Sequence, residues 1–214
     1  MQQPRRILSI LGTRPEAIKM APVVHALEAA AWAESRVLTT GQHRELVDDQ
    51  LSFFGVTADI ALDVVKPGQD LPALTAAMLP ALDEALRAEH PALVLAQGDT
   101  TTVLAAALAC HYRRVPFGHV EAGLRTGDLA APFPEEANRV VADRLSALAF
   151  APTERAKQQL RREGRTKGVY VTGNPVVDAL LWTRARLPQS TDAARTRRRL
   201  LVTTHRRESV GEGL

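Results

Sequence analysis

The 214-residue sequence is 45% hydrophobic and 24% charged, which is ordinary for a globular protein. It contains no run of about 18 apolar residues, the length that a membrane-spanning helix needs. Its net charge of +3 is unevenly spread, because residues 1–150 hold 13 Lys/Arg against 18 Asp/Glu and residues 151–214 hold 14 against 6. The basic part lacks interleaved aromatic residues and any nucleic-acid-binding motif, so we expect a solvated face that could meet an anionic small molecule, and no nucleic acid partner.

Strands and helices are expected to alternate along the first half of the sequence. Gly12 closes the first apolar run and Pro15 suits the first turn of a helix, but Pro22 is expected to break that helix because it lacks a backbone donor. Pro80 is expected to kink a later helix for the same reason. The predicted strands span residues 6–11, 36–40, 60–65 and 92–96, and the predicted helices span residues 15–30, 43–54, 71–89 and 103–112.

The alternation continues in the second half and predicts an α/β fold, a Rossmann-like parallel sheet with helices on both faces. We assign residues 1–188 to an N-terminal Rossmann-like domain with a connecting helix. Residues 189–214 hold a linker and a lone strand, which cannot form a domain, so we interpret them as the start of a truncated C-terminal domain. The predicted strands span residues 115–120, 148–151, 169–172 and 200–203, and the predicted helices span residues 135–145 and 176–187, with another opening at residues 152–154.

Polar residues follow five of the predicted strands. All strands of a parallel sheet end at one edge, where open α/β sheets bind their ligands, so these residues are expected to converge. Residues 119–139 hold four carboxylates, two arginines and a histidine beside a buried strand, and unpaired buried charge is costly. We predict a shared active site that includes residues 12–14, 41–43, 98–100, 121–125 and 204–206.

Several familiar motifs are absent from the sequence. Without G-x-G-x-x-G there is no dinucleotide fingerprint, and without G-x-x-x-x-G-K-[ST] or G-x-S-x-G there is no sign of a P-loop protein or a serine hydrolase. Cys110 is isolated and no H-E-x-x-H spacing occurs, so no metal is expected and Cys110 is expected to pack in the core. The apolar run near the N-terminus is too short for a signal peptide, and the cytoplasm is the expected location.

Six segments, in order between residues 7 and 208, resemble the non-hydrolysing UDP-N-acetylglucosamine 2-epimerases. That family's fold consists of two Rossmann-like domains that face each other across a cleft, as in GT-B glycosyltransferases. The resemblance covers the whole of the first domain and only the first strand and loop of the second. The segments are residues 12–22 (GTRPEAIKMAP), 98–102 (GDTTT), 119–128 (HVEAGLRTGD), 134–139 (PEEANR), 171–174 (VTGN) and 205–208 (HRRE).

The resemblance implies reversible conversion of UDP-GlcNAc to UDP-ManNAc. The C2 proton of the sugar is not activated by a neighbouring carbonyl, so the family expels UDP from C1 as C2 loses its proton, which gives a 2-acetamidoglucal intermediate. UDP then adds back while a proton reaches the opposite face of C2. No redox step occurs, so no cofactor is expected. The family also suggests a homodimer.

The resemblance also assigns roles to particular residues, while leaving open which carboxylate removes the proton. Gln42 and His43 match a second, activating UDP-GlcNAc site, although the sequence departs from the family nearby at Glu45 and at residues 67–68. Asp99, Glu121, Glu135 and His205 match catalytic positions, and Arg14, Arg125, Asn138, Arg139 and Arg206 match substrate-binding positions.

Each of these residues also has a plainer structural explanation. Asp99 could cap a helix, Glu135 could compensate a helix dipole, and Glu121 could pair with Arg125 or Arg139. Arg14 could pair with Glu16, and His205 could be an exposed loop histidine.

Two other functions remain open. One is a hydrolysing epimerase that releases ManNAc and UDP, and the other is a non-catalytic nucleotide-sugar-binding fragment. In the family the second domain holds the uracil, the ribose and much of the diphosphate. The 214-residue chain is therefore expected to be inactive by itself.

Overall fold

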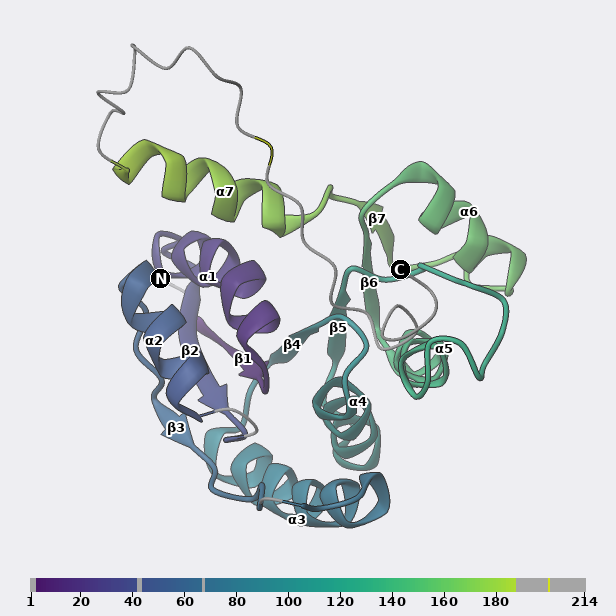
Figure 1. The fold of residues 1–214 in the computed structure, drawn as a ribbon, viewed down its shortest axis with the longest axis horizontal. Helices are drawn as coiled ribbons and strands as arrows, with labels where there is room; N and C mark the ends of the chain where they lie inside the picture. Colours follow the sequence, from purple (N-terminus) through teal and green to yellow (C-terminus); the bar gives the residue numbers. More distant parts are fainter. Residues whose placement is uncertain (1–2, 42–43, 67, 188–199, 201–214) are drawn as a thin grey trace.

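The described residues, 3–41, 44–66, 68–187 and 200 of a computed structural model, form one parallel sheet flanked by helices (Figure 1). The strand order is β3-β2-β1-β4-β5-β6-β7, and every neighbouring pair is parallel. The strands are β1 (Arg5–Leu11), β2 (Ala33–Thr39), β3 (Ile60–Ala61), β4 (Leu93–Gln97), β5 (Phe117–Val120), β6 (Leu148–Ala151) and β7 (Val169–Val171). The helices are α1 (Arg14–Glu28), α2 (Arg44–Phe54), α3 (Leu71–Glu89), α4 (Thr101–Arg113), α5 (Glu135–Leu145), α6 (Glu154–Arg162) and α7 (Pro175–Arg186).

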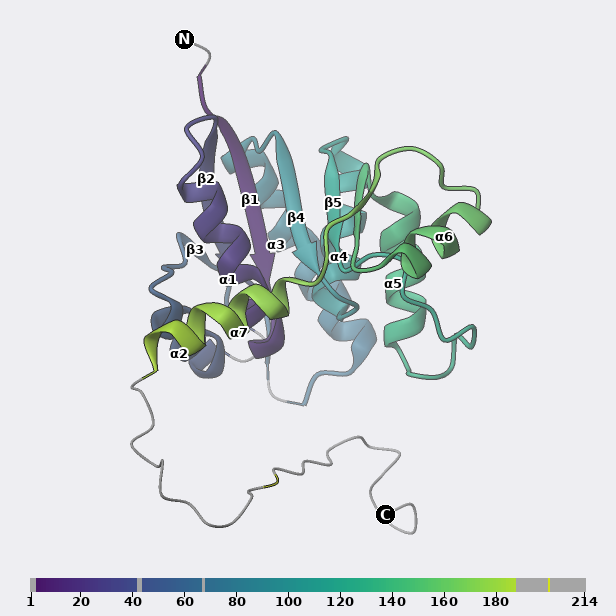
Figure 2. The ribbon, with the colours of Figure 1, turned by 90° about the horizontal axis from the view of Figure 1, so that it is seen from above.

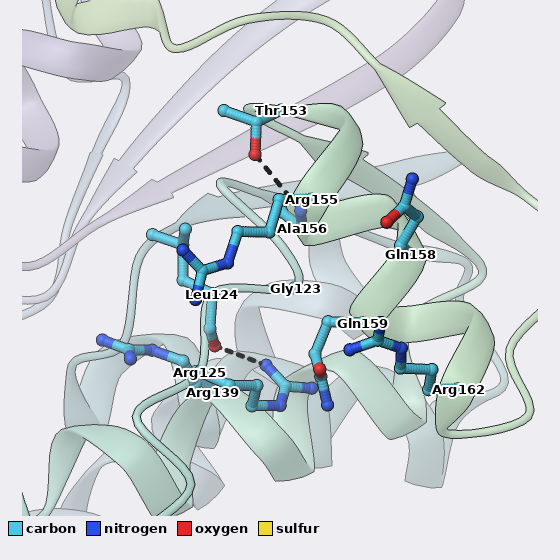
Figure 3. Close-up of a pocket in the computed structure, with 10 residues that line it drawn as sticks. All are labelled: Gly123, Leu124, Arg125, Arg139, Thr153, Arg155, Ala156, Gln158, Gln159 and Arg162. Carbon is cyan, nitrogen blue, oxygen red and sulfur yellow. Dashed lines mark hydrogen bonds between the residues drawn. The ribbon is translucent and has the colours of Figure 1, made fainter.

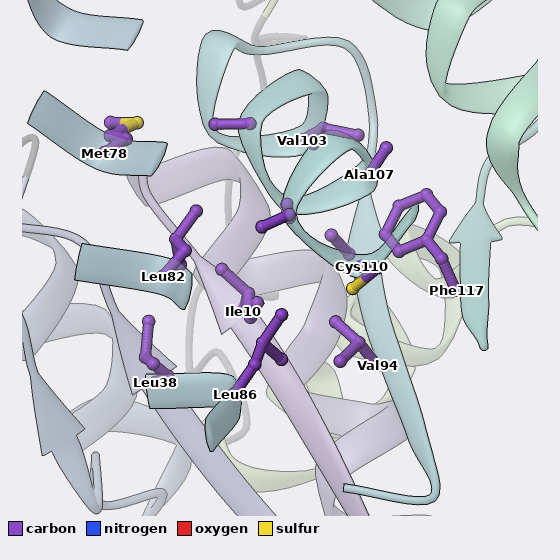
Figure 4. Close-up of a cluster of buried hydrophobic side chains, with 14 of the residues drawn as sticks. Ile10, Leu38, Met78, Leu82, Leu86, Val94, Val103, Ala107, Cys110 and Phe117 are labelled. Atoms are coloured by element: carbon purple, nitrogen blue, oxygen red, sulfur yellow. The ribbon is translucent and has the colours of Figure 1, made fainter. Parts of the chain in front are cut away.

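Two helical layers cover opposite faces of the sheet, which confirms the predicted fold class. Side chains alternate along β1, so Ile7 and Leu11 pack with α1 and α2, whereas Leu8 and Ile10 pack with α3 and α4. Figure 4 shows this second core layer, in which Cys110 is fully buried as the sequence predicted. Burial raises the pKa of its thiol to about 12, so Cys110 is an inert core residue.

Helix α7 packs against α1, and its Trp182 side chain reaches the aromatic residues of α2 (Figure 2). The indole ring of Trp182 lies 4.8 Å from the ring of Phe54 and 5.8 Å from the ring of Phe53, both in α2, and 5.9 Å from His25 in α1. This aromatic contact joins the last described helix to the first two.

Three local expectations require correction or refinement. Helix α1 continues unbroken through Pro22, since it packs against β1, β2, α2 and α7, and tertiary packing outweighs the lost hydrogen bond. Helix α3 also continues through Pro80, and the kink expected there stays a prediction. The predicted strand at residues 60–65 is ordered as a strand only over Ile60–Ala61, because its partner β2 ends at Thr39.

Some sequence predictions lie outside the described residues. They include all of the predicted strand at residues 200–203 except Leu200, and the linker expected within residues 189–214. Among the described helices, none is long and apolar enough to cross a membrane.

Candidate active site

The chain leaves β1 and β4, which are neighbours, in opposite directions, and this topological switch point is where open α/β sheets bind ligands. Glu16 joins the two strand ends. Its carboxylate accepts hydrogen bonds from the amides of Gly12 and Thr13, both at 2.6 Å, and from the hydroxyl of Thr100 at 2.5 Å. Burial raises the pKa of Glu16, while these hydrogen bonds oppose the shift.

Arg14 lies at this switch point as the first residue of α1, where its side chain is exposed. Because Glu16 bonds to Gly12, Thr13 and Thr100, the structure favours a helix-capping role for that carboxylate over the suggested pair with Arg14. The first turn of α1 therefore presents a cationic side chain beside a helix N-terminus, a combination that suits anions.

Asp99 follows β4 in a turn that Gly98 allows by adopting a left-handed φ of 89°. Its carboxylate pairs with the guanidinium of Arg139. Its backbone carbonyl accepts a hydrogen bond from the side-chain amide of Asn138 at 2.9 Å. The N-cap of α4 is Thr100, so Asp99 does not serve as the cap. Helix α5 therefore holds Asp99 through two adjacent side chains, both of which were predicted site residues.

Glu121 follows β5 and takes a left-handed φ of 71°, which is uncommon for a residue with a side chain and often marks a functional position. Its carboxylate accepts hydrogen bonds from Lys19 of α1 at 2.7 Å and from Gln97 of β4 at 2.8 Å. The alternative pairing of Glu121 with Arg125 or Arg139 is not formed, because both arginines are held by other carboxylates. Neither Lys19 nor Gln97 was predicted as a site residue.

Glu135 and Glu136 open helix α5 but have different surroundings. Glu135 is partly buried and lies one turn before Asn138 and Arg139, on the helix face that meets Asp99. Glu136 is 1% exposed, and its carboxylate accepts hydrogen bonds from the amides of Thr126 and Gly127 and from Arg139 at 2.7 Å. Glu136, which the sequence analysis did not single out, therefore orients the arginine that holds Asp99.

Arg125 has two carboxylate partners within the chain. It lies 2.7 Å from Asp143 and forms a two-pronged contact with Glu163 at 2.7 and 2.8 Å. Burial would lower the pKa of Arg125, but the two carboxylates outweigh it and raise that pKa. Its predicted role in substrate binding stays a prediction, and any contact with substrate would share a guanidinium that already has two partners.

Arg165 lies just beyond α6, in the segment that we expected to be a solvated basic face. Its guanidinium instead donates to the backbone carbonyls of Asp143 and Ser146 at 2.7 and 2.6 Å. This expectation is therefore wrong for Arg165, because its guanidinium satisfies carbonyl groups at the C-terminal end of α5.

A cavity of about 590 Å³ lies between the loop after β5 and helix α6 (Figure 3). This volume is within the range of small-molecule sites. Four arginines in its lining give it a positive character, which suits phosphate groups. The lining residues are Gly123, Leu124, Arg125, Arg139, Thr153, Arg155, Ala156, Gln158, Gln159 and Arg162.

Gly123 is required where the loop after β5 passes α6, and replacing it with alanine should destabilise the protein by about 2–4 kcal/mol. Its φ is 83°, and an added Cβ would overlap the backbone carbonyl of Ala156. Gly127→Ala is the matched control, because Gly127 has a φ of 87° but no neighbour within 4 Å of an added Cβ. Urea unfolding should show a clearly smaller loss for Gly127→Ala, and equal losses would contradict the close approach.

Four predicted site residues, Gln42, His43, His205 and Arg206, lie outside the described residues. Within the part of the chain that the structure describes, no group of three or more His, Cys, Asp or Glu side chains is arranged to hold a metal ion.

The topology and the polar groups at the switch point define a Rossmann-like α/β domain of the type found in GT-B-like proteins. The chain belongs to the UDP-N-acetylglucosamine 2-epimerase family, whose model matches residues 25–214, and this confirms the family resemblance. It is 50% identical to a Ralstonia solanacearum protein named "Probable UDP-N-acetylglucosamine 2-epimerase", over 98% of the chain and 59% of that protein. It is 47% identical to the Salmonella typhimurium UDP-N-acetylglucosamine 2-epimerase, over 97% of the chain and 58% of the relative.

Solved structures show the same architecture. The Neisseria meningitidis UDP-GlcNAc 2-epimerase bound to UDP-GlcNAc matches with a TM-score of 0.82 at 46% identity, over 85% of this chain and 50% of that one. A Listeria monocytogenes structure matches with a TM-score of 0.89 at 43% identity, over 99% of this chain and 57% of that one. A lipopolysaccharide galactosyltransferase, WaaB, shares only the fold, at 13% identity and a TM-score of 0.54. That match covers 78% of this chain and 44% of WaaB. The chain thus spans between about half and three fifths of the epimerases that it matches.

Proposed function

We propose that the chain is the first half of a non-hydrolysing UDP-N-acetylglucosamine 2-epimerase, which interconverts UDP-GlcNAc and UDP-ManNAc. The observation that carries this proposal is the pair of carboxylates, Asp99 and Glu121, at the ends of adjacent strands, each held by a cationic side chain. The relatives named as epimerases and the Neisseria structure bound to UDP-GlcNAc support it.

The proposed reaction removes one proton from C2, breaks the C1–O bond reversibly, and returns a different proton to the opposite face of C2. A carboxylate takes the proton from C2, the C2–H electrons form a C1=C2 double bond, and the C1–O bond breaks so that UDP leaves with its electron pair. In the return step UDP attacks C1 and a proton is delivered to the other face of C2. Because the proton leaves one face of C2 and another arrives at the opposite face, the site needs proton-transfer groups on both sides of the sugar ring. In this proposal Asp99, Glu121 and Glu135 are those groups.

Positive groups are proposed to stabilise the departing diphosphate. Arg14 and the N-terminus of α1 lie at the switch point, and Arg139 lies between Asp99 and the arginine-lined cavity. His205 and Arg206 are proposed to join them from outside the described residues. We further propose that Arg125 and Asn138 position the sugar side of the site.

The remaining elements of the proposal concern partners and regulation. The reaction has no net redox change, so we propose that it uses no cofactor. By family likeness, Gln42 and His43 would contribute to a second UDP-GlcNAc site, and the enzyme would form a homodimer.

The purified 214-residue chain is expected to form no detectable UDP-ManNAc, because the relatives' second half is missing from it. The chain joined to the second half of the Ralstonia solanacearum relative should restore turnover. Incubation with UDP-GlcNAc in D₂O should give UDP-ManNAc that carries deuterium at C2, since the returned proton comes from solvent-exchanged groups.

Three outcomes would change the proposal. Normal turnover by the 214-residue chain would refute its dependence on a second half. Free ManNAc and UDP as the products would indicate a hydrolysing epimerase. Calorimetric binding of UDP-GlcNAc by a folded chimera that shows no turnover would favour a non-catalytic binding module.

A further inference from the structure

His119 is fully buried on β5, and both of its ring nitrogens face oxygen atoms. Nδ1 lies 2.6 Å from a carboxylate oxygen of Asp143, and Nε2 lies 2.7 Å from the backbone carbonyl of Gly98. A carbonyl oxygen can only accept a hydrogen bond, so Nε2 must carry a proton. The state of the ring then depends on what faces Nδ1.

The contacts of the second carboxylate oxygen of Asp143 stabilise its ionised form. Its second carboxylate oxygen lies 2.7 Å from Arg125 and accepts a hydrogen bond from the amide of Gly123 at 3.0 Å. Both the guanidinium of Arg125 and the amide of Gly123 favour the charged form of this carboxylate, independently of the state of His119. An ionised carboxylate only accepts, so Nδ1 must donate as well.

We propose that His119 is an imidazolium that positions Asp99 by holding the Gly98 carbonyl. The charges around it form two contacting pairs, His119 with Asp143 and Arg125 with Glu163. Arg165 donates to the backbone carbonyl of Asp143. On β5 itself, His119 stacks against the uncharged ring of Phe117, 6.1 Å between centroids.

The backbone on both sides of the Asp99 side chain is fixed by this arrangement. The Gly98 amide donates to the Val120 carbonyl at 3.1 Å, the Gly98 carbonyl accepts from His119, and the Asp99 carbonyl accepts from Asn138. His119 is thus a positioning residue, with no assigned contact to substrate. The reason why Asp99 needs such positioning rests on the proposed function, whereas the charge on His119 does not.

The charge can be measured on the unmodified 214-residue chain by NMR with ¹⁵N-labelled histidine. In the folded chain at neutral pH, both ring nitrogens of His119 should carry protons, because each faces an acceptor oxygen. The exposed histidines His90 and His111 provide references within the same spectrum. A single protonated ring nitrogen at His119 would overturn the proposal, whether or not the epimerase function is correct.

Two pairs of variants test the cause of the charge and its effect on Asp99. Asp143→Asn should convert His119 to a neutral ring with a proton on Nε2 alone, because an amide can donate to Nδ1; a ring still doubly protonated would show that Asp143 does not set its charge. His119→Gln keeps a donor near the position of Nε2 and should preserve the Gly98 carbonyl ¹³C shift and the Asp99 amide signal, whereas His119→Phe should move both. Parent-like signals in His119→Phe would refute the positioning role, and failure of a variant to fold leaves the measurement on the unmodified chain decisive.

Discussion

Replacing Asp99 with asparagine in the active chimera should lower the rate of epimerisation by about 100-fold or more. The amide cannot exchange a proton with C2, and it also removes the charge that pairs with Arg139. The side chain is partly exposed beside the arginine-lined cavity, so substrate can reach it. Initial rates of UDP-ManNAc formation, measured over a range of UDP-GlcNAc concentrations, should show the loss in kcat.

Asp83→Asn is the matched control for this substitution. Asp83 pairs with Arg113 on the surface formed by α3 and α4, away from the strand ends, and exposed pairs contribute little. The epimerisation rate of the Asp83→Asn chimera should stay close to that of the parent chimera. A similarly small change for Asp99→Asn would remove Asp99 from proton transfer and leave Glu121 and Glu135 as the candidates.

Replacing Asp143 with alanine should lower the free energy of unfolding by about 3–5 kcal/mol, because it removes the buried carboxylate that faces His119 and one of the two carboxylates that hold Arg125. Asp143 is 2% exposed and contacts His119, Arg125 and the amide of Gly123. Urea unfolding of the 214-residue chain measures this loss directly. A loss below about 1 kcal/mol would show that the network is not a main source of stability.

The pH dependence of the Asp143→Ala effect has a definite sign. The folded-state pKa of Asp143 is lowered, so its stabilising contribution is present above the unfolded value of about 3.9 and is lost as the pH falls through the folded value. The difference in free energy of unfolding between the parent and Asp143→Ala should therefore become smaller below about pH 4. Asp83→Ala, which removes an exposed carboxylate, should leave the unfolding midpoint near that of the parent at neutral pH.

Much of the fold could be predicted because it depends on local patterns. Apolar runs followed by glycine mark the strand ends, and alternation with helices requires a parallel sheet, so Asp99 and Glu121 could be expected at the same edge. The strand at residues 60–65 was overpredicted because strand length depends on the partner, and β2 ends at Thr39. The break expected at Pro22 was wrong because packing of α1 overrides a local preference.

The partners of the charged groups could not be predicted in the same way. Glu121 pairs with Lys19, which is 102 positions away in the sequence, and Arg125 pairs with Asp143 and Glu163. Such pairs form only after helices from distant parts of the chain pack against the strand ends. Arg125 and Arg139, the nearby alternative partners considered for Glu121, are paired with other carboxylates.

The sequence by itself determined the parallel α/β architecture, the family and the edge of the sheet that carries the candidate carboxylates, because each follows from short patterns that neighbouring residues encode. Only the tertiary structure decided that Glu136 is the buried member of an adjacent glutamate pair, and that His119 lies between Asp143 and the Gly98 carbonyl. Neighbouring helical residues point about 100° apart, so the docking of α5 on the sheet determines which one is buried. Partner choice at the site is thus a property of packing, which no local pattern specifies.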